Sequence, residues 1–337
     1  MTRVTLKDIA DKLGFSVSYT ARAFKGRPGI PPLACQKVRE MAGQLGYQPD
    51  PMLTALSAYR QARKPAAFQG TLAFLTTEFD EKRWLATPET GDLLNGARER
   101  AESLGYRIEY FNIGKDHKTH LRVWKMLRSR GIRGAIIRAL PFELHRFDVP
   151  FGQFPHIYLF SEPHVPTAPA ISSYHAQSME LVLQELLKRG YRHPALVLSS
   201  ELSEFLHHSW RMAFYAHATK FARHAVHSHE KLEINPVALS RWLKQERADV
   251  LIYCTSENFI PKLPGTRQSD CVCMDLLYPD CGVAGIYQNR RHGGSVAVDW
   301  MQSMLLTAQA GNNPNPHVIM IPGIWKEGTG SLKTGSH

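Results

Sequence analysis

The first apolar pattern in the chain spans residues 6–13 and repeats with the period of an α-helix. Thr5 precedes this pattern and Asp8 follows three positions later, which is the spacing of a capping box at a helix N-terminus. Gly14 is suited to end the helix, because glycine adopts the left-handed conformation without a steric penalty. We therefore expect a short amphipathic helix over residues 6–13.

Two more helices are expected before residue 47. Ser16 can cap a helix over about residues 17–24. Glycines and prolines then break the chain between residues 26 and 32, and a third helix is expected over about 33–45, closed by Gly46. Two short helices joined by a tight turn that contains glycine, with a third packed behind, predict a helix-turn-helix.

Residues 50–59 suggest one further short helix, with Asp50 as its N-cap and Pro51 in its first turn. A helix of this length is marginally stable in water without a partner. Residues 61–69 are basic and contain a proline, so we expect a linker there.

From Gly70 onward the pattern alternates between short apolar runs and amphipathic helices. The expected strands are 71–76, 106–111, 134–138, 156–160, 194–198 and 249–253. The expected helices are 93–104, 121–130, 177–189, 204–221 and 238–246. Strands separated by helices of this length favour parallel sheets with right-handed crossovers. Two such blocks, before and after about Glu162, predict an α/β fold with two doubly wound parallel-sheet subdomains behind an all-α headpiece.

Charge is distributed unevenly along the 337 residues. The net charge is +11, and residues 1–64 carry eleven Lys or Arg against four Asp or Glu, which leaves little positive excess for the rest. A basic excess on a helix-turn-helix is typical of a protein that binds the phosphates of nucleic acid. A charged face that is merely solvated remains the alternative from composition alone.

Cysteine usage and hydropathy point to a reduced compartment. The five cysteines show no disulfide-framework spacing, and Cys271, Cys273 and Cys281 lack the second paired set expected of a metal site, so we expect buried thiols. No apolar stretch approaches the ~20 residues of a membrane span, and the chain starts without a hydrophobic run. We expect a cytoplasmic protein without a metal or cofactor.

The N-terminal pattern resembles the headpiece of the LacI/GalR family of bacterial transcription regulators. The matching residues are 4–10, 14–16, 22, 26, 28–29, 37–38 and 45–50. A thinner resemblance to the periplasmic-binding-protein-like effector domain of the same family continues at residues 95–97, 104–106, 189–193, 210–211, 287–288, 294–297 and 322–325. The headpiece matches are numerous and in register, which makes them specific.

The resemblance implies three segments along the chain. Residues 1–49 would be the DNA-binding headpiece, 50–69 the hinge helix and linker, and 70–330 the effector-binding and dimerisation domain. The N-subdomain would comprise about 70–162 and 290–320. The C-subdomain would comprise about 163–289 and 321–330.

Family positions imply the residues that contact DNA. Val17, Ser18 and Arg22 would read bases, and arginine can bond guanine through two hydrogen bonds. Phosphate contacts are implied for Thr5, Ser16, Tyr19, Lys25 and Tyr47. In the hinge helix, Leu53 and Leu56 would approach the minor groove, with Leu56 as the wedge. The alternative for these two leucines is packing on the effector domain.

Two departures from the family pattern lie in the second helix. The residues before Arg22 are Tyr19, Thr20 and Ala21, where the family has Thr-Val-Ser, so one hydroxyl contact is lost. Thr20 places a hydroxyl where a buried valine is usual. These differences affect which operator sequence is bound.

The resemblance also implies a small-molecule site between the subdomains. Arg211 and Asp275 match effector-contacting positions, and Glu257 replaces the usual Asn-Asp pair. Side chains that could stack on a sugar are Phe79, Trp84 and Phe160, each with a core position as the alternative. A guanidinium and a carboxylate are suited to bind pairs of sugar hydroxyls, so we expect a carbohydrate effector.

The sequence thus predicts a transcription regulator, a repressor, that binds a pseudo-palindromic DNA operator as a homodimer under effector control. It shows no phosphate-loop glycine motif, Gly-x-Ser-x-Gly or His-Glu-x-x-His, so we do not expect an enzyme. The histidines between residues 207 and 229 are expected on a partly exposed helix and loop. A solute-binding protein with a vestigial headpiece is the alternative function, because the effector fold alone does not decide between them.

Overall fold

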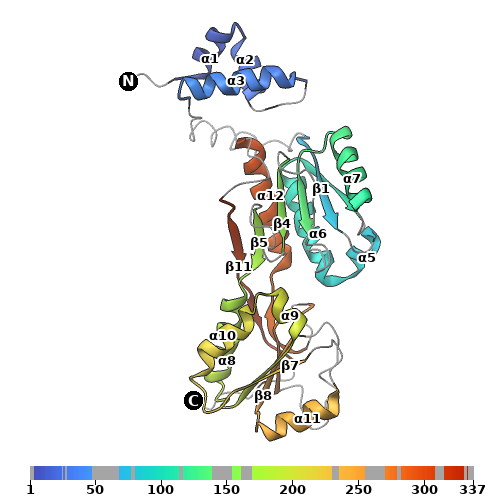
Figure 1. Cartoon of the computed structure of the whole chain (residues 1–337), viewed down its shortest axis with the longest axis vertical. Coiled ribbons are helices and arrows are strands. Elements are labelled where there is room, and N and C mark those ends of the chain that lie inside the picture. Colours follow the sequence, from blue (N-terminus) through green and yellow to red (C-terminus); the bar gives the residue numbers. More distant parts are fainter. Residues whose placement is uncertain are drawn as a thin grey trace.

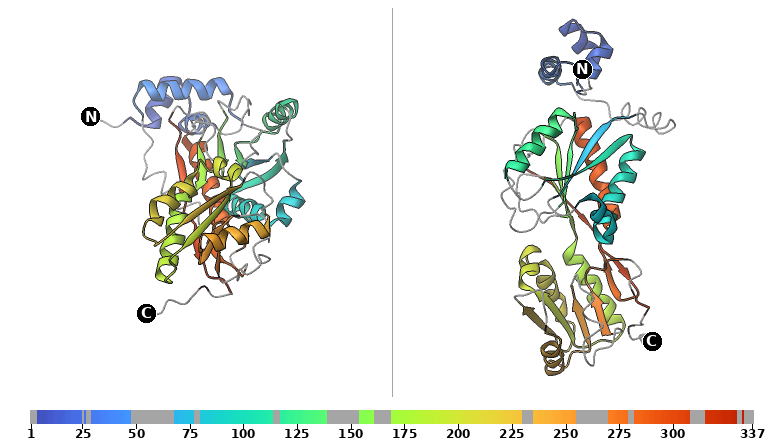
Figure 2. Two further views of the ribbon diagram at one scale, coloured as in Figure 1. Left: turned by 60° about the horizontal axis from the view of Figure 1, so that its bottom comes forward. Right: turned by 90° about the vertical axis from the view of Figure 1, so that its right-hand side faces the viewer.

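The structure, a computed structural model, describes residues 4–24, 26, 29–47, 68–76, 80–113, 117–138, 154–160, 169–229, 235–254, 270–278, 282–307, 315–329 and 332. Figure 1 shows these residues as a helical headpiece and two α/β subdomains arranged along the long axis of the molecule. The right-hand view of Figure 2 shows the same three bodies from the side. The predicted fold class is confirmed.

The headpiece contains the three expected helices, α1 (Leu6–Leu13), α2 (Val17–Phe24) and α3 (Pro32–Gln44). The Asp8 carboxylate accepts a hydrogen bond from the backbone N–H of Thr5 at 2.7 Å, and Gly14 ends α1 at φ 67°. The Ser16 hydroxyl accepts from the Tyr19 N–H at 3.1 Å and so caps α2. These local signals produced the helix boundaries that the sequence predicted.

The first subdomain is built on a six-stranded parallel sheet with the order β11-β5-β4-β3-β1-β2. Its strands are β1 (Gly70–Thr76), β2 (Tyr106–Asn112), β3 (Ala135–Arg138), β4 (His156–Leu159), β5 (Ala170–Ser173) and β11 (Val318–Ile321). Its helices are α5 (Glu81–Ala86), α6 (Pro88–Ser103), α7 (His117–Ser129) and α12 (Arg290–Thr307). Helices α6 and α12 cover one face of the sheet, and α7 covers the other.

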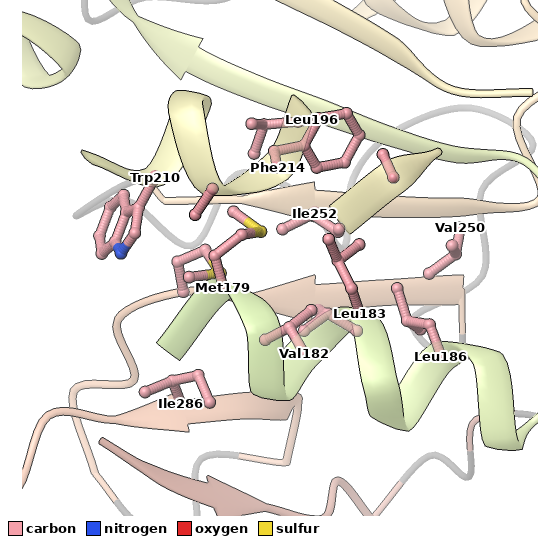
Figure 3. Packing of buried hydrophobic residues seen from close by; sticks show 14 of the residues in the cluster. Met179, Val182, Leu183, Leu186, Leu196, Trp210, Phe214, Val250, Ile252 and Ile286 are labelled. Atoms are coloured by element: carbon pink, nitrogen blue, oxygen red, sulfur yellow. The ribbon is translucent and has the colours of Figure 1, made fainter. Parts of the chain in front are cut away.

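The second subdomain repeats this design with the order β12-β10-β9-β8-β6-β7. Its strands are β6 (Pro194–Ser199), β7 (Ala225–His229), β8 (Val250–Tyr253), β9 (Cys271–Cys273), β10 (Ala284–Tyr287) and the antiparallel edge strand β12 (Ile324–Lys326). Its helices are α8 (His175–Lys188), α9 (Ser200–Phe205), α10 (Ser209–Ala218) and α11 (Pro236–Gln245). Figure 3 shows how Met179, Leu183 and Phe214, from α8 and α10, pack onto one face of this sheet.

The chain crosses between the two subdomains at Tyr174, at Gln288–Asn289 and at Pro322–Gly323. The carboxyl end of β5 leads directly into α8 of the second subdomain, so the carboxyl ends of all strands parallel to β5 face that subdomain. Likewise the carboxyl end of β10 leads into α12 of the first subdomain. The carboxyl ends of the two parallel sheets therefore face each other.

Close packing of α6 on α12 depends on two glycines. A Cβ added at Gly96 would lie 2.0 Å from the carbonyl oxygen of Arg291, and one at Gly294 would lie 2.2 Å from that of Leu93. Because these contacts are with backbone, no side-chain rotation could relieve them. The glycines explain how a helix from the end of the chain packs against one from its first third.

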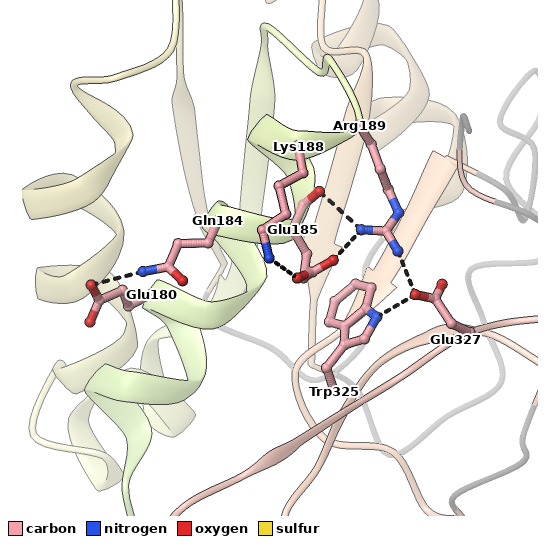
Figure 4. Close-up of polar contacts among 7 residues, drawn as sticks. All are labelled: Glu180, Gln184, Glu185, Lys188, Arg189, Trp325 and Glu327. Atoms are coloured by element: carbon pink, nitrogen blue, oxygen red, sulfur yellow. Dashed lines mark hydrogen bonds and ion pairs between the residues drawn. The ribbon is translucent and has the colours of Figure 1, made fainter. Parts of the chain in front are cut away.

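At the far end of α8, Arg189 links this helix to β12 (Figure 4). Arg189 forms ion pairs with Glu185 and Glu327, and its guanidinium lies 5.3 Å from the centroid of the Trp325 ring. Burial alone would raise the pKa of the Glu185 carboxyl, but hydrogen bonds from Lys188 and Arg189 hold that pKa below its ordinary value. This network fixes the last strand onto the second subdomain.

Three details of the sequence-based picture are wrong. Strand β5 belongs to the first sheet, so the chain leaves that sheet at Tyr174, later than the expected division near residue 162. The single helix expected over 204–221 is split into α9 and α10, because His207 and His208 adopt left-handed φ values of 46° and 58°. His227 and His229 lie on strand β7, where a loop was expected.

Candidate nucleic-acid interface and ligand site

Helix α2 presents the predicted base-reading side chains on its outer surface. Ser18 and Arg22 are exposed, and Val17 is 45% exposed despite its apolar side chain. On the opposite side, Ala23 packs with Ile9 of α1 in the core of the headpiece. The structure therefore brings Val17, Ser18 and Arg22 together on one exposed helix, supported from behind by α1 and α3.

The side chains expected at phosphates lie around this helix, but several already take part in contacts within the headpiece. The Thr5 hydroxyl donates to Asp8 at 2.7 Å. The Tyr19 ring packs edge-on against Phe15, with centroids 5.0 Å apart, and the Tyr47 ring packs edge-on against Phe24 at 5.5 Å. Ser16 remains exposed beside the turn.

Thr20, noted above as a departure from the family pattern, is completely buried in the headpiece. Its hydroxyl oxygen has no hydrogen-bond partner among the described residues. A buried hydroxyl without a partner costs about 1–3 kcal/mol, so this position weakens the headpiece relative to an apolar residue of the same shape. Lys25, Leu53 and Leu56 lie outside the described residues.

The second candidate site lies where the carboxyl ends of the two sheets face each other. In doubly wound folds, ligands bind at the carboxyl ends of strands, next to the point where the strand order reverses. That point lies between β1 and β3 in the first sheet and between β6 and β8 in the second. Arg138 ends β3, and its Nη1 donates to the carbonyl of Phe160 at 3.0 Å.

Asp275, the predicted ligand-binding carboxylate, forms an ion pair with Arg290, whose side chain is only 5% exposed. Arg290 begins α12, and its guanidinium also donates to the carbonyl of Leu276 at 3.4 Å. The carboxylate thus connects the loop after β9 to the helix that returns to the first subdomain. Its negative charge is matched within the protein.

Tyr287 makes a second connection between the subdomains. Its hydroxyl donates to the Asp92 carboxylate on α6. Burial, together with this hydrogen bond, raises the pKa of Tyr287 to about 12. The phenol therefore keeps its proton at neutral pH and stays a donor to Asp92.

Arg211 lies on the first turn of α10, beside the first crossing between the subdomains. Its neighbour Trp210 packs edge-on against His175 at 5.2 Å, directly after the crossing at Tyr174. Arg211 is half-buried, and within the described part of the chain it takes part in no hydrogen bond or ion pair. A half-buried guanidinium in this position is a candidate for binding a ligand.

The aromatic candidates fall into different environments. Trp84 is completely buried, with its ring 5.4 Å from Phe74 and 6.0 Å from Tyr110, so the prediction that it stacks on a ligand is wrong in this structure. The Phe160 ring lies against Gly293 of α12, at the end of β4. Phe79 and Glu257 lie outside the described residues.

Sequence reasoning missed Arg138, Tyr287 and Arg290 as site residues. Arg138 carried a usable signal, because a charged residue directly after a buried apolar strand lies at the sheet edge where ligands bind. Arg290 carried none, since its pairing with Asp275 depends on the course of the chain. In the described ranges, no group of three His, Cys, Asp or Glu could hold a metal ion, and no helix there has the length and hydropathy to cross a membrane.

Comparison with known proteins identifies the fold. No protein-family model and no curated protein matches the sequence. Among solved structures, the lac repressor dimer bound to operator and the anti-inducer ONPF matches with a TM-score of 0.56 at 16% identity, over 98% of this chain and 100% of that one. The transcriptional regulator CelR in its cellobiose complex matches with a TM-score of 0.55 at 15% identity, over 97% and 100% of the two chains.

A LacI transcriptional regulator from Lactobacillus brevis also matches, with a TM-score of 0.56 at 15% identity, over 76% of this chain and 100% of that one. These neighbours are transcription regulators of the LacI type, and the chain has their fold. The architecture that the sequence resemblance implied is thereby confirmed.

Proposed function

We propose that this protein is a LacI/GalR-family transcription regulator that binds a pseudo-palindromic DNA operator as a homodimer and acts as a repressor. The observation that carries the proposal is the exposed surface of α2, with Val17, Ser18 and Arg22, on a basic headpiece joined to a two-subdomain α/β domain. The lac repressor, which shares this fold, is described as a dimer bound to operator. The headpiece supplies the DNA contacts, and the two sheets supply a ligand site.

Control by a small molecule, a sugar or sugar derivative, follows from the second site. Facing strand ends that belong to two different subdomains can close around a ligand, and ligand binding would then favour one relative orientation of the subdomains. Cellobiose is the ligand of the CelR complex, which supports a carbohydrate effector here. The solute-binding alternative predicts the same closure without any affinity for DNA.

The Arg22→Ala variant tests the recognition helix. Arg22 is expected to bond a base edge, so its loss should relax the preference for one base pair in each half-site by about 1–3 kcal/mol. The measurement is selection of binding sites from random duplex DNA by the full-length wild type and the variant. Lys25→Ala is the matched control, because losing a phosphate contact weakens binding to all sequences alike.

If wild type and Arg22→Ala select the same motif, α2 does not read DNA in the proposed register. If wild type selects no motif at all, the solute-binding alternative is favoured.

A further inference from the structure

The charges of the described residues at the facing strand ends are unequally matched. Of the carboxylates, Asp275 pairs with Arg290, and Asp92 accepts from Tyr287 and lies 3.8 Å from Arg291. Glu201 and Glu204 on α9 are exposed to solvent, where water and salt screen their charge. The protein thus already matches the carboxylates that connect its two subdomains.

The cations at this interface are placed differently. Arg138 ends a central strand of the first sheet at the point where the strand order reverses, and its hydrogen bond to the Phe160 carbonyl fixes the guanidinium there. Arg211 belongs to the second subdomain and is half-buried without a hydrogen bond or ion pair among the described residues. One guanidinium from each subdomain therefore borders the region where the strand ends meet.

Such an arrangement disfavours closure around a neutral molecule. Two like charges that approach each other as water is excluded repel more strongly, because the effective dielectric constant falls. An acidic group between them reverses the sign of this interaction, and planar guanidinium groups match the geometry of carboxylate and phosphate oxygens.

We propose that the effector carries an acidic group, a phosphate or a carboxylate, which Arg138 and Arg211 bind from opposite subdomains. This inference rests on the proposed effector-controlled function and narrows the ligand class from sugars in general to sugar phosphates or sugar acids. The acidic group would also drive closure, since it offsets the repulsion between the two guanidinium groups.

A thermal-shift comparison of the full-length protein tests the proposal. The probes are glucose, galactose and fructose, their 6-phosphates, and the corresponding uronic or aldonic acids, all at one ionic strength, with inorganic phosphate as the control for a general anion effect. A ligand that binds only the folded state raises the midpoint. We expect a rise with an acidic probe above that of its neutral parent, and the two acidic sets distinguish phosphate from carboxylate.

Variants then locate the binding groups. Arg138→Gln and Arg211→Gln should each weaken binding of the best acidic probe about tenfold to a hundredfold in titration calorimetry, as expected for a lost hydrogen bond to a charged group. Arg192→Gln is the matched control, because Arg192 is exposed at the opposite, amino-terminal end of β6. The ligand-free midpoint of each variant shows whether it folds.

The proposal is overturned if the neutral sugars raise the midpoint as much as the acidic probes, if no acidic probe raises it, or if both glutamine variants keep wild-type affinity. A failure of the proposed function gives a different result, because an acidic probe would then bind as described while the full-length protein shows no affinity for DNA.

Discussion

Replacing Trp84 with alanine is expected to lower the free energy of unfolding by about 3–5 kcal/mol, the usual loss for a large aromatic residue in a core. Trp84 is completely buried between α5 and the first sheet and packs against the rings of Phe74 and Tyr110. Removing it leaves a cavity that the surrounding residues fill only in part. Denaturant unfolding of the full-length wild type and variant measures the difference.

Two further variants make this test specific. Leu85→Ala, at the adjacent exposed position, should change the stability by no more than about 0.5 kcal/mol. Trp84→Phe should cost less than Trp84→Ala, because the indole N–H has no hydrogen-bond partner among the described residues, so none is lost. An alanine variant with unchanged stability and impaired ligand binding would restore Trp84 as a ligand contact.

The second large effect is expected at Asp275. Asp275→Ala should lower the free energy of unfolding by about 3 kcal/mol, because it leaves the nearly buried Arg290 guanidinium without its carboxylate partner. The double variant Asp275→Ala/Arg290→Met should recover part of this loss, since it removes the buried charge as well. A double-mutant cycle by denaturant unfolding gives the coupling between the two residues.

This outcome separates two roles for Asp275. If the carboxylate mainly binds the ligand, the single variant unfolds like the wild type and loses ligand affinity. If it mainly holds the loop after β9 to α12, the single variant is destabilised and the coupling with Arg290 is large. The ion pair seen in the structure favours the second result, and an additive double-mutant cycle would contradict it.

The elements that the sequence predicted well are those with local causes. Helix α1 is bounded by the Thr5–Asp8 cap and by Gly14, whose left-handed φ glycine adopts readily. Strands β1, β6 and β8 are continuous apolar runs, as expected of strands buried on both faces of a parallel sheet. In each case the residues that determine the element lie within it or next to it.

The elements that were missed depend on distant partners. Strand β5, Ala-Ile-Ser-Ser, has too few large apolar residues to be recognised and is fixed by pairing with β4 and β11. The break between α9 and α10 places two histidines in a conformation that favours glycine, stabilised in part by the Ser203 hydroxyl, 2.9 Å from Nδ1 of His208. No local pattern indicates either feature.

The same distinction holds for the candidate sites. The α2 surface was predictable because helix period and capping decide which side of a short helix is buried. The ligand site was predictable only as a location at the strand ends, since the partners of Asp275 and the burial of Trp84 depend on how α12 and α5 pack on the first sheet.

The most direct test of the central claim is the affinity of the full-length protein for its selected duplex as a function of salt concentration, compared with the chain lacking residues 1–59. Several Lys and Arg on each headpiece should release counterions, so the logarithm of the affinity should fall steeply with the logarithm of the salt concentration. The truncated chain should lose this affinity. Salt-independent binding, or full affinity after truncation, would contradict the assignment of DNA binding to the headpiece.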